Sequence, residues 1–68
     1  MNDWKRVFST PKAYDANLVL DLLIKNNIHA VSMNEKDTSF VVLGDIDIFV
    51  HDKDEERALE LIKNFKRE

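Results

Sequence analysis

The sequence of 68 residues predicts an α+β fold, in which two helices lie on one face of a small antiparallel sheet. Three observations support this expectation: short segments rich in β-branched and aromatic residues, two longer segments with apolar residues at helical spacing, and polar turns between them. A chain of this length is expected to form one domain over residues 1–68. At this size only about 60% of the unfolded chain's surface is buried, so stability should be marginal.

The first predicted strand covers residues 4–9, a short run of aromatic and β-branched side chains. Strict alternation places Val7 on one face of this strand and both Trp4 and Phe8 on the other. Both faces therefore carry apolar groups. That pattern is typical of a strand that is covered on both sides.

A helix is predicted over residues 12–26, with Thr10 as its N-cap and Pro11 at its first position, where the missing N–H costs nothing. Ser9 is an alternative cap. Asn26 and Asn27 are expected to end the helix, because asparagine accepts the left-handed conformation of a C-terminal cap. The expected core stripe is Ala16, Val19, Leu20 and Leu23, widened by Leu22 and Ile24.

Two or three further strands are predicted in the middle of the chain. Residues 28–33 form the second strand, and the polar run 34–39 forms an exposed loop. Residues 40–43 are then a separate short strand, with a turn at Gly44 leading into the strand 46–51. Alternatively, the whole segment 39–50 is one long strand with a bulge at Gly44.

The second helix is predicted to start at Asp52, which forms a capping-box pattern with Glu55. Acidic residues at its start and basic residues at its end both agree with the helix dipole. An acidic run of this kind also suits a cation, but it lacks the loop spacing and glycine of a calcium motif. The expected core stripe is Ala58, Leu59, Ile62 and Phe65, with Leu61 alongside.

The element order strand, helix, strand, strand, helix matches a ferredoxin-like plait that lacks its last strand. The sheet order should then be 1-3-2, and the first strand should be an edge that something else covers. On the third strand Ile46, Ile48 and Val50 should face the helices. On the opposite face Phe49 is expected to form an apolar patch with Trp4 and Phe8, or with Val7, according to the register of the first strand. This face and the exposed edge provide a candidate interaction surface: Trp4, Phe8 and Phe49.

Composition excludes several classes of partner. Thirteen acidic and ten basic residues give a net charge of −3, which opposes the phosphate attraction that nucleic-acid binding needs. The longest apolar run, residues 18–24, is interrupted by Asp21, so no membrane segment is expected. The sequence has no cysteine, which rules out disulfides and fits a reducing cytoplasm. Self-association or another protein is therefore the expected partner.

The chain also resembles a prokaryotic family of small signal-transducing domains, whose fold is similar to that of the nitrogen-regulatory PII proteins. The resemblance covers nearly the whole chain. It implies a PII-like plait with a sensing or partner-binding role and no catalytic residues. The segments that carry it are Arg6-Val7-Phe8-Ser9-Thr10, Ala16-Asn17-Leu18-Val19, Leu22-Leu23, Asn27-Ile28-His29-Ala30, Ile46-Asp47-Ile48-Phe49-Val50 and Asp54-Glu55-Glu56-Arg57-Ala58.

Candidate chemical groups are few. No nucleophile has an evident base, and His29 and His51 stand at no metal-ligand spacing, so we expect no enzyme, no metal and no cofactor. A small anion could bind near Ser9, Thr10 and Tyr14, beside free N–H groups at the start of the first helix. The expected function is thus a non-catalytic regulatory or interaction module. The alternative is a PII-like sensor of a small anion or nucleotide, bound at the start of the first helix or beside the loop 34–39.

Overall fold

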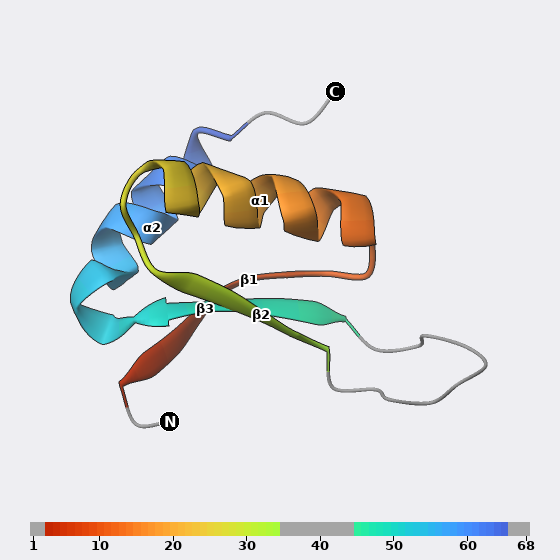
Figure 1. The fold of residues 1–68 in the computed structure, drawn as a ribbon, viewed down its shortest axis with the longest axis horizontal. Coiled ribbons are helices and arrows are strands. Elements are labelled where there is room, and N and C mark those ends of the chain that lie inside the picture. The colour runs from red at the N-terminus through yellow and green to blue at the C-terminus, as the bar shows by residue number, and fades with distance from the viewer. Residues whose placement is uncertain (1–2, 35–44, 66–68) are drawn as a thin grey trace.

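A computed structural model of the chain describes residues 3–34 and 45–65 (Figure 1). Its elements are β1 (Trp4–Thr10), α1 (Ala13–Lys25), β2 (Ala30–Asn34), β3 (Ile46–His51), the short 3₁₀ helix η1 (Asp52–Asp54) and α2 (Glu55–Lys63). The strands form one antiparallel sheet in the order β1-β3-β2. The α+β class is therefore confirmed, and the sheet has the order expected of a ferredoxin-like plait that lacks its last strand.

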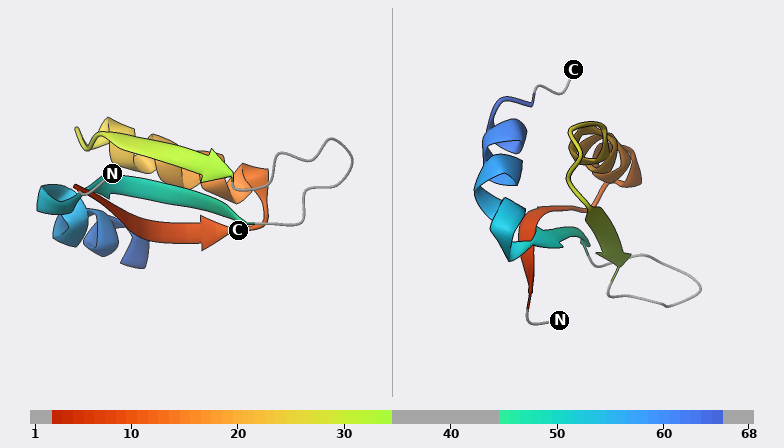
Figure 2. Two further views of the ribbon diagram at one scale, coloured as in Figure 1. Left: turned by 90° about the horizontal axis from the view of Figure 1, so that it is seen from below. Right: turned by 60° about the vertical axis from the view of Figure 1, so that its left-hand side comes forward.

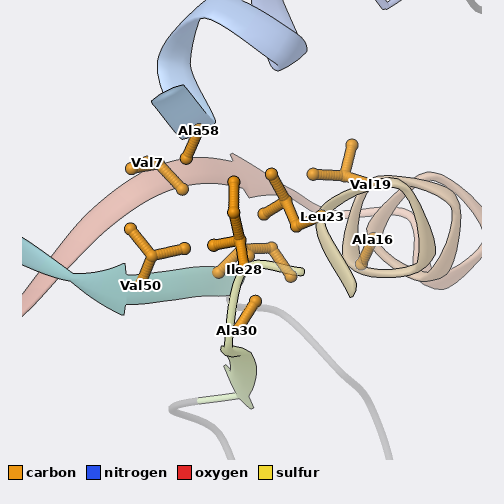
Figure 3. Close-up of a cluster of buried hydrophobic side chains, with 9 residues drawn as sticks. Val7, Ala16, Val19, Leu23, Ile28, Ala30, Val50 and Ala58 are labelled. Carbon is orange, nitrogen blue, oxygen red and sulfur yellow. The ribbon is translucent and has the colours of Figure 1, made fainter. Parts of the chain in front are cut away.

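Both helices pack on the same face of the sheet, as Figures 1 and 2 show. Ile48 and Val50, on the central strand β3, are completely buried beneath them, and Ile46 packs against the same core. This confirms the predicted orientation of the third strand. The buried apolar side chains between the layers are Val7, Ala16, Val19, Leu23, Ile28, Ala30, Ile48, Val50 and Ala58 (Figure 3).

Helix α1 buries most of the predicted stripe but begins differently from the prediction. Lys12 is the N-cap residue, and no side chain caps the helix. Thr10 is still part of β1, where it pairs with Ile46, and its buried hydroxyl accepts a 3.2 Å hydrogen bond from the Lys12 N–H. The predicted cap at Thr10 or Ser9, with Pro11 as the first helical residue, is therefore wrong, because the strand extends one residue further than expected.

The end of α1 forms as predicted. Asn27 has a φ of 65°, the left-handed conformation that asparagine tolerates better than most residues. Its N–H donates to the Ile24 carbonyl, and the Ile28 N–H donates to the Leu23 carbonyl, each at 3.0 Å. These two bonds make a Schellman motif. Ile28 and Leu23 are both buried in the core (Figure 3). The second strand starts at Ala30 and not at residue 28, because the turn occupies the residues before it.

The predicted capping box at the second helix does not form. The Asp52 N–H, which Glu55 would have to bind, donates instead to the Asp3 carbonyl at 2.6 Å. Asp52 begins the 3₁₀ turn, and α2 starts only at Glu55, with no side-chain cap bond at either N-cap. The sheet therefore uses the donor that the capping box requires.

Helix α2 presents a slightly different stripe from the one predicted. Ala58 is buried, and Leu61, Ile62 and Phe65 pack against the core, but Leu59 is 44% exposed. Including Leu59 in the stripe was wrong, because positions 58, 61, 62 and 65 already make one helical face. On α1, Ile24 is likewise exposed.

Arg57 links α2 to the end of α1. Its Nη2 donates to the Asn26 carbonyl at 2.7 Å, and its Nη1 lies 3.6 Å from the Asp54 carboxylate. A cation at the C-terminal end of α1 is favoured by the helix dipole.

The prediction that the exposed loop starts at Asn34 is wrong, because Asn34 pairs with Ile46 as the last residue of β2. Residues 35–39 of that loop, the predicted strand 40–43 and the turn or bulge at Gly44 lie outside the described residues.

Replacing Leu23 by alanine should destabilise the fold by about 2–5 kcal/mol, because it removes a fully buried side chain at the contact between α1 and the sheet. The matched control is Leu59→Ala, the same chemical change on the exposed side of α2, which should cost about 0.5 kcal/mol or less. Urea unfolding followed by circular dichroism measures both free energies. Equal losses would contradict this description of the core.

Candidate functional site

The candidate site is the sheet face opposite the helices, which we call the open face. Residues that alternate with Ile48 and Val50 on β3 point to this face, and so do their cross-strand partners. No described element packs on it in Figures 1 and 2. The open face consists of Trp4, Arg6, Ser9, Val31, Met33, Asp47, Phe49 and His51, with His29 at its end.

Three rings cluster at one end of the open face. Trp4 stacks on His51 with ring centroids 4.2 Å apart, and His29 approaches both rings edge-on at 5.7 and 5.6 Å. Trp4 and His51 are cross-strand partners, next to the pair in which the Asp52 N–H bonds to Asp3. Antiparallel pairs alternate, so Trp4 and His51 form a non-hydrogen-bonded pair, in which side chains lie closest. The backbone register therefore explains the stacking.

Apolar side chains continue from the rings along the open face. Phe49 is half-buried, and its partners on the flanking strands are Arg6 and Val31. Met33 follows on β2 opposite Asp47 and is 45% exposed. Trp4 on β1, Phe49 on β3, and Val31 and Met33 on β2 thus form an apolar strip that crosses all three strands of the open face.

A polar cluster lies at the other end of the open face. Asp47 is only 6% exposed, and its carboxylate accepts a 2.8 Å hydrogen bond from the Ser9 hydroxyl. The Arg6 guanidinium lies 3.9 Å away, and its side chain is 62% exposed. The same Ser9 hydroxyl is also 3.2 Å from the Asp45 carboxylate. Arg6 and Ser9 thus compensate for burying a carboxylate on this face.

The candidate interaction residues Trp4 and Phe49 both lie on the open face, but Phe8 does not. The register of β1 against β3 shifts between Arg6 and Phe8, which leaves Val7 as an extra residue in a β-bulge. Phe8 therefore pairs with Ile48 and packs against the core beside Val7. Strict alternation predicted opposite faces for Val7 and Phe8, and the bulge makes that prediction wrong.

The three residues of the candidate anion site do not converge on a common point. The Ser9 hydroxyl is directed to carboxylates, the Thr10 hydroxyl is buried against Lys12, and Tyr14 is 73% exposed on α1. Two carboxylates near Ser9 repel an anion. The arrangement therefore gives an anion no set of donors in common.

Sequence reasoning missed the ring cluster and the contacts of Asp47. Both depend on which residues of β1 and β3 face each other, a register that residue types alone do not specify. Within residues 3–34 and 45–65, no three His, Cys, Asp or Glu side chains gather as a metal site requires. No helix in this part of the chain is long and apolar enough to cross a membrane.

Fold and site together define a small α+β domain with an apolar, ring-bearing sheet face. Residues 4–66 match the family described as "Putative prokaryotic signal transducing protein", and the chain belongs to this family. That description names signal transduction and no catalytic activity. A search of curated proteins found no match to the chain, and neither did a search of solved structures.

Replacing Ser9 by alanine should destabilise the protein by about 1 kcal/mol, because the buried Asp47 carboxylate loses its shortest hydrogen bond. Ser9→Thr keeps a hydroxyl and should restore most of this loss. Ser32→Ala, at an exposed position of β2, is the matched control and should change stability by less than about 0.5 kcal/mol. Urea unfolding at neutral pH measures all three, and equal effects at the two serines would refute this role.

Inorganic phosphate should leave thermal stability unchanged, since the carboxylates around Ser9 oppose an anion there. The measurement is the melting temperature with phosphate at about 10 mM, where a ligand with a dissociation constant near 0.1 mM would add almost 3 kcal/mol. Sodium chloride at equal ionic strength is the control. A larger, saturable rise with phosphate would support the anion site.

Proposed function

We propose that this protein is a non-catalytic signal-transducing module that binds a partner protein through its open face. The partner is either another protein or a second copy of the chain. Binding of this kind transmits a signal by changing which proteins are associated, and it requires no reaction at the site.

The observation that carries this proposal is the apolar strip on the open face. Trp4, Phe49 and Met33 are partly exposed there, although the opposite face of the same sheet buries its side chains completely at Ile48 and Val50. Contiguous apolar side chains on a small protein mark interaction sites. Aromatic side chains such as tryptophan are also enriched where protein interfaces derive most of their binding energy.

The family supports the same proposal. Its description is of signal transduction, and among the described residues no three His, Cys, Asp or Glu side chains gather as a metal site requires. The polar groups of the open face have structural partners: Asp47 binds Ser9 and lies near Arg6. Chemistry at this face would first have to break these contacts.

Site-specific photocrosslinking in the source cells tests the proposal. Benzoylphenylalanine in place of Met33, on the open face, should give a discrete covalent adduct with the partner. The matched control is the same group in place of Tyr14, which is an exposed aromatic residue on α1 and so on the opposite side of the sheet. We expect no discrete adduct from position 14.

Trp4→Ala in the Met33 probe should reduce the adduct yield by about tenfold, the loss typical of removing one important interface aromatic. Circular dichroism establishes that this variant is folded. An adduct of twice the chain mass identifies a second copy, and sedimentation velocity then measures the dimer directly. Equal adducts from positions 33 and 14, or none from either, would contradict the proposed function.

A further inference from the structure

The edge of the sheet beside the open face is formed by β1. Among the described strands β1 pairs only with β3, so its other side has no described strand. The Asp52 N–H bonds to Asp3, and antiparallel pairs alternate along the strands. Trp4 and Arg6 therefore direct their backbone N–H and C=O groups outward from the sheet. These groups can pair with an added strand.

The same stretch of β1 is basic. Lys5 and Arg6 are adjacent and exposed, in a chain whose net charge is −3. Since neighbouring residues of a strand point to opposite faces, Lys5 lies on the helix side and Arg6 lies on the open face. An incoming strand thus meets a positively charged side chain on each of its faces; Arg6, on the open face, also lies 3.9 Å from Asp47 but is 62% exposed.

Charge disfavours a second copy of β1 as this added strand. Two copies of β1 can pair their outward groups in an antiparallel, two-fold arrangement centred on Trp4, on Lys5 or on Arg6. The second places Lys5 opposite Lys5, and the third places Arg6 opposite Arg6. The first overlaps only at the start of the strand. Like charges directly opposite each other on neighbouring strands are destabilising. The edge is therefore complementary to an acidic strand.

We propose that β1 binds an extended acidic segment of a partner protein as an additional antiparallel strand. This rests on the proposed function and names the partner's chemistry. In this pairing the partner segment contains, in chain order, two acidic residues followed by one apolar residue. The first acid faces Arg6, the second faces Lys5, and the apolar side chain lies on the open face beside Trp4.

The test uses a capped peptide Thr-Val-Glu-Glu-Phe-Val-Thr and the full chain. Trp4 is the only tryptophan, so its fluorescence reports the neighbouring Phe directly. The Glu-Glu peptide should bind saturably, and the matched Lys-Lys peptide should bind at least about tenfold more weakly. Binding of the Glu-Glu peptide should also weaken as salt is raised.

Charge reversal in the protein supplies the matched variants. The double variant Lys5→Glu/Arg6→Glu should bind the Glu-Glu peptide at least about tenfold more weakly than the unchanged protein does. It should bind the Lys-Lys peptide more tightly than the unchanged protein does. Lys12→Glu reverses an exposed lysine outside the strand and should change binding by less than about twofold. Circular dichroism checks that each variant keeps its helices.

Backbone N-methylation of the peptide tests the strand pairing itself. The N–H of the first Glu faces Arg6, and the N–H of the Phe faces Trp4. Methylation of either N–H removes a hydrogen bond to β1 and should abolish binding. Methylation of the second Glu, whose N–H faces away from β1, should have little effect.

No saturable binding at millimolar peptide, equal binding to the charge-reversed protein, or equal effects of all three methyl groups would each overturn the proposal. So would a dimer that the peptide cannot displace, because a second copy would then occupy the edge. The Met33 crosslink distinguishes the two proposals. If the charge-reversed protein still gives the Met33 adduct but does not bind the peptide, the proposed function stands and the proposed acidic strand is wrong.

Discussion

The alternation of side chains along β3 is the constraint on which the remaining structure depends. Ile48 and Val50 are fully buried under both helices, so Asp47, Phe49 and His51 must point to the other face. Because β3 lies between β1 and β2, Asp47 and Phe49 have cross-strand partners on both neighbours. His51 pairs with Trp4 and contacts His29, just before β2. The apolar strip, the ring cluster and the polar cluster are therefore consequences of packing the core.

The bulge at Val7 divides β1 into two parts with different tasks. Before it, Trp4 and Arg6 share the open face; after it, Phe8 joins Val7 against the core, and Ser9 reaches Asp47. If the same residues paired with β3 without a bulge, Phe8 would leave the core and Ser9 would turn away from the buried carboxylate. One inserted position thus supplies an additional core aromatic residue and also the main hydrogen bond of Asp47.

Local sequence signals predicted the elements well because their causes are local. The strand Ile46–His51, the asparagine end of α1 and the sheet order all followed from periodicity, residue conformation and element order. The errors have a common origin in tertiary contacts. Asp3 takes the N–H that a capping box at Asp52 needs, and the strand holds Thr10, which therefore does not cap α1. Predicting the ring cluster requires knowing how β1 pairs with β3, and the sequence of neither strand alone specifies that register.

The open face and the β1 edge meet at Trp4 and Arg6. Each contributes a side chain to the face, and each directs its outward backbone groups to the edge, so one added strand would engage both. A ligand present at a hundred times its dissociation constant stabilises the folded state by about 2.7 kcal/mol. For a domain of this size that is a large part of the total stability. Partner binding at this corner would therefore lower the unfolded population about a hundredfold at that concentration.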